Sequence, residues 1–189
     1  MSRLALAALA MLLIAAPGAA AQDAGEAWAA LVTGNHVALI RHGNAPPGFG
    51  GDPPGFKIDD CATQRNLDDR GRAQARALGE AFRQRGVRVD KILSSPWCRC
   101  LETARLMALG PVDNTPAAAA STRSPERLAA LKQMVSSWRG PGTLVVVTHG
   151  LTVLGLVGIM PRQAETVVLR PTRGSEPGFD VVDRIPEPE

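Results

Sequence analysis

The sequence VALIRHGNAPP, from Val37 to Pro47, changes character at its centre. Its four leading apolar residues predict a strand over residues 36–40 that is covered on both faces, as in the middle of a mainly parallel sheet. The strand then delivers Arg41 and His42 before two prolines end the regular structure. Because reactive groups in such sheets gather at the carboxyl ends of the strands, this stretch predicts an α/β fold with a functional site at that edge.

The rest of the chain repeats the alternation of strand and helix. Runs rich in β-branched or apolar residues predict strands over 89–95, 143–148 and 164–171. Apolar stripes at helical spacing predict helices over 22–32, 66–86, 96–110, 125–138 and 151–160, with Pro96 opening the third of them. Residues 112–120 fit a short strand followed by alanines. The predicted architecture is a three-layer α/β/α sandwich with a mainly parallel central sheet.

The first 21 residues differ in composition from everything that follows. Arg3 precedes an apolar stretch from Leu4 to Ala16, and small residues follow it. This is the pattern of a secretory signal peptide, and it predicts a periplasmic or secreted protein with no membrane span after cleavage; an uncleaved anchor is the alternative. The expected organisation is a signal peptide over 1–21, one domain over 22–171 and a C-terminal tail over 172–189 that holds an edge strand at most.

The charge balance is close to neutral. The chain has 21 basic and 18 acidic residues, a net charge of +3, and loss of the leader removes one basic residue. A general nucleic-acid or anionic-membrane binder would be far more basic, so we expect neither as a partner. Any strong positive potential must therefore be local.

The chain has three cysteines, and an exported protein meets an oxidising compartment in which a disulfide can persist. Cys98 and Cys100 are separated by one residue, so Cys61 can pair with either of them, and the third thiol is left over. The chain has three histidines, at positions 36, 42 and 149, and no second cysteine pair at zinc-site spacing. No metal site is predicted.

A second strand end repeats the pattern of the first. His149 and Gly150 follow the predicted strand 143–148 just as His42 and Gly43 follow 36–40, and Arg99 lies in the first turn of a predicted helix. A neutral imidazole is a nucleophile, and guanidinium groups match phosphate oxygens two at a time. The glycines allow close approach of backbone. Together these residues predict a pocket that accepts a phosphoryl group.

Four blocks of sequence carry a family resemblance. LIRHGNA, NLDDRGRAQARALG, SSPWCRCLETA and VVVTHG resemble, in order and spacing, the motifs of the histidine phosphatase superfamily, which includes the phosphoglycerate mutases and the phosphohistidine phosphatases. The resemblance runs from Val37 to Leu169. It implies a phosphoglycerate mutase-like fold and a reaction that requires no metal or cofactor.

The resemblance also implies roles for particular residues. His42 would attack phosphorus and become phosphohistidine, with Arg41 and Arg99 binding the phosphoryl oxygens. His149 would complete the pocket as a charged donor. Gly43 and Arg65 are the further candidates for substrate binding.

One departure from the family pattern concerns the proton donor. Many members have a glutamate or aspartate after the third strand, where this chain has PAAAAS at residues 116–121. The remaining candidates for the acid are Asp59, Asp60, Asp113 and Glu126. Without a donor, the leaving group must be a weak base, as in a phosphoramidate or a pyrophosphate.

These observations predict an exported phosphatase that acts on a small phosphorylated compound or on a phosphorylated protein side chain. Mutase activity fits an exported chain less well. The alternative is a phosphate- or phosphoester-binding module of the same fold with weak catalysis or none, or a scaffold whose pocket is idle. The loop over 46–57, rich in proline and glycine, either covers the pocket or lies on the surface.

Overall fold

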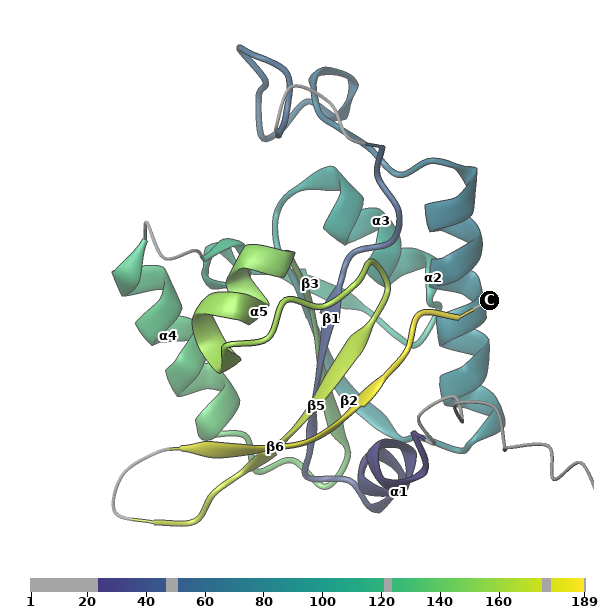
Figure 1. The fold of residues 1–189 in the computed structure, drawn as a ribbon, viewed down its shortest axis with the longest axis vertical. Coiled ribbons are helices and arrows are strands. Elements are labelled where there is room, and N and C mark those ends of the chain that lie inside the picture. Colours follow the sequence, from purple (N-terminus) through teal and green to yellow (C-terminus); the bar gives the residue numbers. More distant parts are fainter. Residues whose placement is uncertain (1–23, 47–50, 121–123, 175–177, 189) are drawn as a thin grey trace, which may run out of the picture.

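The computed structural model describes residues 24–46, 51–120, 124–174 and 178–188, so the predicted signal peptide lies outside the described residues. Figure 1 shows a central sheet with helices on both sides. The helices are α1 Gly25–Thr33, α2 Asp69–Gln84, α3 Cys98–Leu106, α4 Pro125–Ser136 and α5 Gly150–Val157, with short 3₁₀ turns η1 Cys61–Thr63 and η2 Pro116–Ala119. The strands are β1 Val37–Arg41, β2 Val89–Ser94, β3 Val112–Asn114, β4 Thr143–Thr148, β5 Thr166–Pro171 and β6 Phe179–Ile185.

The sheet is mostly parallel, as predicted. Its strand order is β3-β2-β4-β1-β5-β6. The first four strands in that order are parallel to one another, and β5 and β6 extend the sheet with antiparallel pairings. The edge strand expected in the tail is β6. The domain limits at residues 22 and 171 stay a prediction, although β6 shows that pairing in the sheet continues beyond residue 171.

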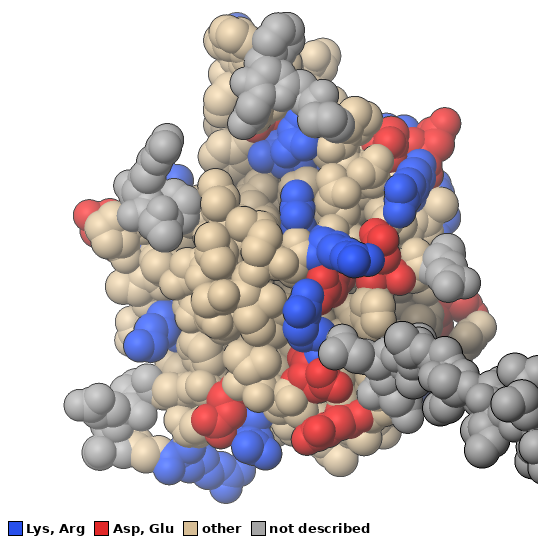
Figure 2. Space-filling view, viewed as in Figure 1, with Lys and Arg blue, Asp and Glu red and all other residues tan. Residues whose placement is uncertain are grey.

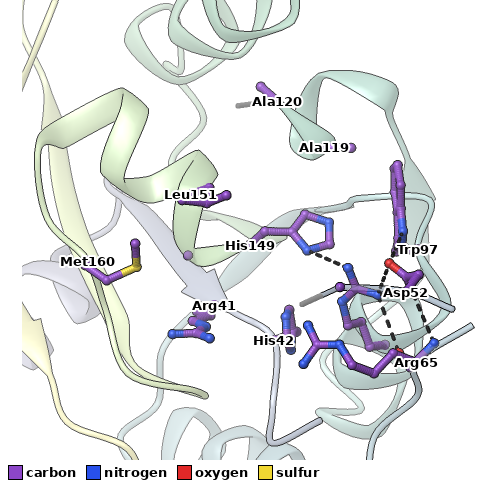
Figure 3. A pocket seen from close by; sticks show the side chains of 13 residues that line it. Arg41, His42, Asp52, Arg65, Trp97, Ala119, Ala120, His149, Leu151 and Met160 are labelled. Carbon is purple, nitrogen blue, oxygen red and sulfur yellow. Dashed lines mark hydrogen bonds and ion pairs between the residues drawn. The ribbon is translucent and has the colours of Figure 1, made fainter. Parts of the chain in front are cut away.

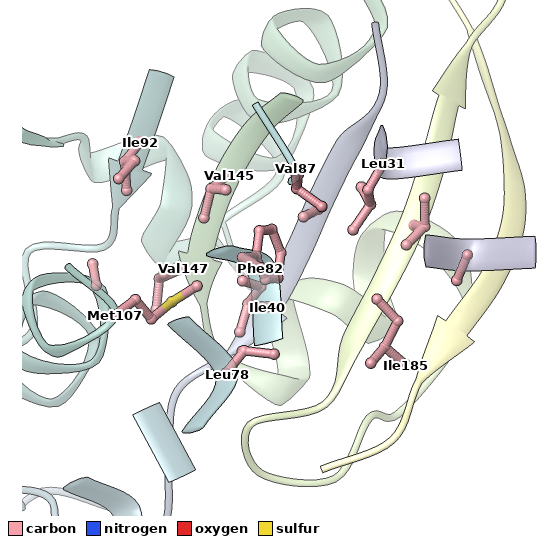
Figure 4. Close-up of a cluster of buried hydrophobic side chains, with 14 of the residues drawn as sticks. Leu31, Ile40, Leu78, Phe82, Val87, Ile92, Met107, Val145, Val147 and Ile185 are labelled. Atoms are coloured by element: carbon pink, nitrogen blue, oxygen red, sulfur yellow. The ribbon is translucent and has the colours of Figure 1, made fainter. Parts of the chain in front are cut away.

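Strand β1 is buried on both faces because its side chains alternate between two cores. Ala38 and Ile40 belong to the core beneath α1, α2 and α3, while Val37 and Leu39 belong to the core beneath α4 and α5. Figure 4 shows the first core, in which Phe82 from α2 packs near Ile40. Packing on both faces fixes the position of the strand, and therefore of the residues that leave its end.

The register of the sheet brings three strand ends to one edge. Arg41, the last residue of β1, pairs with Thr148, the last residue of β4. The His42 N–H donates to the Thr148 carbonyl at 2.9 Å, which extends this register one residue past the strand. On the other side of β4, the Ser95 N–H donates to the Val147 carbonyl at 2.9 Å. The residues that follow β1, β4 and β2 are therefore held side by side.

Two details differ from the prediction. Pro96 does not open α3, because the helix begins at Cys98 with Trp97 as its N-cap. Residues 112–120, which were ambiguous, form β3 and then η2. Within the described ranges, none of the helices has the length and apolar character needed to cross a membrane.

Candidate active site

A pocket of about 330 Å³ opens at the carboxyl ends of β1 and β4 (Figure 3). All four predicted catalytic residues line it. The lining consists of Arg41, His42, Gly51, Asp52, Arg65, Trp97, Arg99, Ala119, Ala120, His149, Gly150, Leu151 and Met160. Segments more than a hundred residues apart in the sequence thus contribute to one cavity, as the motif spacing predicted.

His42 is oriented by its own neighbour in the chain. Its Nδ1 lies 2.8 Å from the Gly43 carbonyl oxygen, which can only accept, so Nδ1 carries the proton and Nε2 keeps the lone pair. Burial lowers the pKa of His42, the Gly43 hydrogen bond offsets this only in part, and the charge of Arg99 adds to the lowering, so the pKa falls to about 3. The imidazole is therefore neutral at pH 7 and has the nucleophilic form.

Gly43 has a different position from the one predicted for a substrate-binding residue. It is not among the described residues that line the pocket. Its N–H donates to Thr103 Oγ1 at 3.1 Å, and a Cβ atom at this position would lie 2.5 Å from the Gly71 carbonyl oxygen. The glycine is needed because α2 approaches closely, and its carbonyl then holds His42.

His149 lies across the pocket from His42, with the two ring centroids 5.5 Å apart. Its Nε2 is 2.8 Å from Ser95 Oγ and its Nδ1 is 3.4 Å from Arg99 Nη2. Burial and the Arg99 charge lower the pKa of His149 well below its ordinary value. Desolvation beside a guanidinium group thus favours the neutral form of His149, and its role as a charged donor stays a prediction.

Three arginines surround the histidines with one carboxylate among them. Arg41 donates from Nη1 to the Pro161 carbonyl at 2.8 Å, and Arg65 donates from Nη1 to the Ala45 carbonyl at 2.9 Å. Burial first, and then the charge of Arg99, lower the pKa of both. With neutral histidines, three arginines and Asp52 give the lining residues a net charge of +2. Such a pocket attracts an anion.

Asp52 is the functional residue that the sequence did not reveal. Both of its carboxylate oxygens accept from Arg99 Nη1, at 2.8 and 3.1 Å. Oδ1 also accepts from the Arg65 N–H, and Oδ2 accepts from Trp97 Nε1, each at 3.0 Å. Asp52 thereby fixes the side chain of Arg99 and the ring of Trp97. A loop of glycines and prolines gives no periodic signal that could have identified it.

The cysteine pairing left open by the sequence is Cys61 with Cys98. This disulfide joins the segment that carries Arg65 to the first residue of α3, one residue before Arg99. Cys100 is the free cysteine, and its Sγ lies 3.6 Å from His149 Nε2. Burial raises the pKa of its thiol to about 12, so it stays protonated and packs beside the ring.

The candidate acids lie elsewhere. Among the described residues of the lining, Asp52 is the single carboxylate, and Asp59, Asp60, Asp113 and Glu126 are all outside it. Asp60 caps η1 instead. The loop over 46–57 reaches the pocket through Gly51 and Asp52, while its residues 47–50 lie outside the described part. In the same described part, no cluster of three or more His, Cys, Asp or Glu is placed to hold a metal.

Comparison with known proteins gives three kinds of match. Residues 37–117 match the model of the histidine phosphatase superfamily (branch 1). A curated relative, the mitochondrial serine/threonine-protein phosphatase Pgam5 of Drosophila virilis, is 33% identical over 72 residues, which are 38% of this chain and 22% of the relative. The chain thus matches about a fifth of the length of its curated relatives.

Solved structures share the fold at low sequence identity. One is the protein histidine phosphatase SixA complexed with tungstate, with a TM-score of 0.60 and 16% identity over 80% of this chain and 96% of that one. Another is the product of open reading frame Rv3214 from Mycobacterium tuberculosis, with a TM-score of 0.61 and 14% identity over 81% and 98% of the two chains. The predicted resemblance is thus confirmed over part of the chain: residues 37–117 match the histidine phosphatase superfamily, and the chain has the phosphoglycerate mutase-like fold.

Proposed function

We propose that this protein is a phosphatase that hydrolyses phosphoryl compounds through a phosphohistidine intermediate on His42. The observation that carries the proposal is the pairing of a neutral His42, whose Nε2 has the lone pair, with a lining of net charge +2. The family match over residues 37–117 supports phosphatase chemistry in general. No metal or cofactor takes part in the scheme.

In the proposed first step, Nε2 of His42 forms a bond to phosphorus while the bond from phosphorus to the leaving oxygen breaks. Arg41, Arg65 and Arg99 stabilise the charge on the phosphoryl oxygens, and the first turn of α5 adds the partial positive charge of a helix N-terminus. In the second step, water attacks phosphorus and the N–P bond breaks. The products are inorganic phosphate and the original neutral His42.

His149 has a supporting role in this scheme. Arg99 can only donate, so the Nδ1 of His149 accepts and its Nε2 carries the proton toward Ser95. The second histidine therefore holds Arg99 in place at the start of the reaction. A phosphate dianion beside it would favour its protonated form, because an opposite charge raises the pKa of an imidazole.

The export of the protein belongs to the same proposal. A leader over residues 1–21 would deliver the chain to an oxidising compartment, and the Cys61–Cys98 disulfide is compatible with that setting. N-terminal sequencing of the protein recovered from its native cell envelope tests this part, and a chain that retains residue 1 would contradict it.

A second candidate function is a phosphate-binding module without turnover, which the alanines at 119 and 120 favour because they supply no acid. The two are separated with p-nitrophenyl phosphate, whose leaving group needs no proton. A phosphatase turns it over and loses that activity in His42→Ala. A pure binding module binds inorganic phosphate by calorimetry but releases no nitrophenol, and that result would overturn the proposed enzyme.

A further inference from the structure

The pocket has unlike walls. Histidines and arginines make up most of its polar lining, and Ala119, Ala120, Leu151 and Met160 form an apolar wall that Arg41 borders. In Figure 3, Leu151 and Met160 lie on the side of the pocket opposite Arg65 and Asp52, with Arg41 below them, while Ala119 and Ala120 lie above His149. We propose that the preferred substrates are phosphate monoesters of phenols, with the aromatic ring of the leaving group seated against this apolar wall. The inference rests on the proposed phosphatase function and specifies its substrate class.

Among the described residues of the lining, no carboxyl group has a proton to give to a leaving oxygen. Asp52 is the single carboxylate of the described lining, and each of its oxygens accepts two hydrogen bonds. Burial alone would raise the pKa of Asp52, but the hydrogen bonds from Arg65 and Arg99 outweigh it and the pKa is lowered. An ionised carboxylate that is held in this way positions Arg99 and cannot serve as an acid.

Neighbouring segments do not supply the missing acid either. Residues 47–50 (PGFG) and 121–123 (STR) adjoin the pocket in sequence, and neither contains an aspartate or a glutamate. The Nε2–H of His149 is directed at Ser95 Oγ, 2.8 Å away, and Nε2 of His42 is the nucleophile and carries no proton. The leaving group must therefore depart as a stable anion. A phenol has a pKa of about 10, as in tyrosine, whereas an aliphatic alcohol such as serine is a far weaker acid.

The wall that faces the leaving group is apolar. Leu151 is 57% exposed and Met160 is 48% exposed, so both present apolar surface beside the charged groups of the pocket. Figure 2, viewed as Figure 1, shows the surface over α5 without charged side chains. Trp97, with its ring centroid 5.5 Å from that of His149, adds an aromatic edge to the lining.

A stable leaving anion and an apolar wall disfavour serine, glycerol and pyrophosphate leaving groups. Serine and glycerol phosphates require a proton and carry polar leaving groups. The leaving group of a pyrophosphate is a weak base, but it is a phosphate anion. Its charge would lose hydration against Leu151 and Met160. A phenol satisfies both conditions, because its anion is stable and its ring buries apolar surface. The phenol is either free or the side chain of a tyrosine.

The test compares kcat/KM across four phosphoryl compounds with the full mature chain. They are phenyl phosphate, a phosphotyrosine peptide, the matched phosphoserine peptide and acetyl phosphate, which has a good leaving group without a ring. We expect phenyl phosphate to exceed the phosphoserine peptide by about a hundredfold, the scale of an absent general acid. Within a series of substituted phenyl phosphates, kcat/KM should rise steeply with the acidity of the phenol.

The outcomes are distinct. Turnover of both aryl substrates supports the class and admits a protein side chain, whereas turnover of phenyl phosphate alone restricts it to small phenols. Hydrolysis of acetyl phosphate without a preference for aryl over serine phosphate overturns this inference and leaves the phosphatase intact. Failure on all four compounds overturns both proposals together.

A variant pair tests the missing acid directly. Ala119 is partly exposed at the pocket and follows β3 in the sequence, where the acid was expected. Ala119→Glu should raise kcat/KM for the phosphoserine peptide at least tenfold and flatten the dependence on phenol acidity, because it adds a proton donor. Ala119→Gln has the same size without the proton and should give no such rise. Equal behaviour of the two variants, both folded by circular dichroism, would contradict the argument.

The apolar wall is tested with Leu151→Asp. This change should lower the ratio of kcat/KM for phenyl phosphate over acetyl phosphate about tenfold, since it places a charge against the ring. An unchanged ratio would show that the leaving group does not contact the apolar wall at Leu151.

Discussion

Arg41 and His42 leave a strand that is bonded to neighbours on both sides, whereas Asp52 and Arg65 reach the same pocket on a segment outside the sheet. Here the strand wall means Arg41, His42 and His149, and the loop wall means Asp52 and Arg65. Both are distinct from the apolar wall described above. Cores on two faces fix the strand wall. The loop wall is fixed by the four hydrogen bonds to Asp52 and by the Cys61–Cys98 disulfide.

The difference between the walls separates chemistry from positioning. The strand wall contains the group that would form a bond to phosphorus, and its geometry depends on the register of β1 against β4. The loop wall contributes charge and holds Arg99, which lies on α3 between the two walls. Substitutions in the strand wall should therefore abolish turnover and leave the fold intact. Substitutions in the loop wall should also lower the free energy of unfolding.

The largest expected effect is that of His42→Ala. Loss of the nucleophile should lower kcat for p-nitrophenyl phosphate roughly 10³-fold or more, as for other catalytic nucleophiles. Circular dichroism should stay unchanged. His36→Ala is the matched control, since His36 lies outside the pocket and contacts the Gly34 carbonyl. Full activity of the His42 variant would remove the strand wall from the mechanism.

Arg99→Ala should have the next largest effect. It removes charge from the transition state, and kcat should fall about 10²–10³-fold. Arg105→Ala lies on the same helix but is exposed and should lose less than twofold. The two variants are compared by kcat with the same substrate, and equal losses would contradict the assigned position of Arg99.

Asp52→Ala breaks a buried ion pair in which each side chain is 8% exposed. The uncompensated Arg99 charge should lower the free energy of unfolding by about 3–5 kcal/mol. Asp180→Ala removes an exposed partner of Arg170 and should cost less than about 1 kcal/mol. Urea titrations of both variants measure the contrast. A loss for Asp52→Ala as small as that for Asp180→Ala would mean that the loop wall is not held by this pair.

Replacing Cys61 and Cys98 together with serine should lower the unfolding free energy by about 2–4 kcal/mol, because the bridge closes a long loop. The two cysteines are 37 residues apart. Activity should fall less than in Arg99→Ala. Reductant should have the same effect on the native protein and no further effect on the double variant, and thermal melts that do not change in either case would contradict the role of the bridge.

The last expected effect is a loss of stability at acid pH. The pKa of His42 falls from 6.5 to about 3 on folding, so between these values the unfolded chain binds a proton that the folded chain does not. The unfolding free energy should therefore decrease as the pH falls from about 6.5 toward 3, with a shallower slope in His42→Asn. Urea midpoints across this range provide the measurement. Equal slopes would show that His42 is not buried in its neutral form.

The strand wall was predictable from sequence because its residues follow runs whose burial fixes their direction. His42 and His149 each come directly after such a run. Asp52 could not be predicted, because nothing in a loop of glycine and proline indicates which residue turns inward.

The cysteine pairing could not be predicted from sequence either. Cys98 and Cys100 differ only in which side of α3 they occupy, and the choice depends on packing. Cys98 meets the loop that carries Cys61, while Cys100 packs against His149. The lowered pKa of His149 has a related cause, because burial beside Arg99 is a property of the folded pocket and not of the motif.

The central claim is that His42 carries the phosphoryl group during turnover. The most direct measurement mixes the protein with acetyl phosphate, quenches at alkaline pH, where phosphohistidine survives, and locates the modification by peptide mass spectrometry. We predict one phosphoryl group on His42 and none in the His42→Ala variant. Turnover without a modified histidine, or with the phosphoryl group on another residue, would contradict the account.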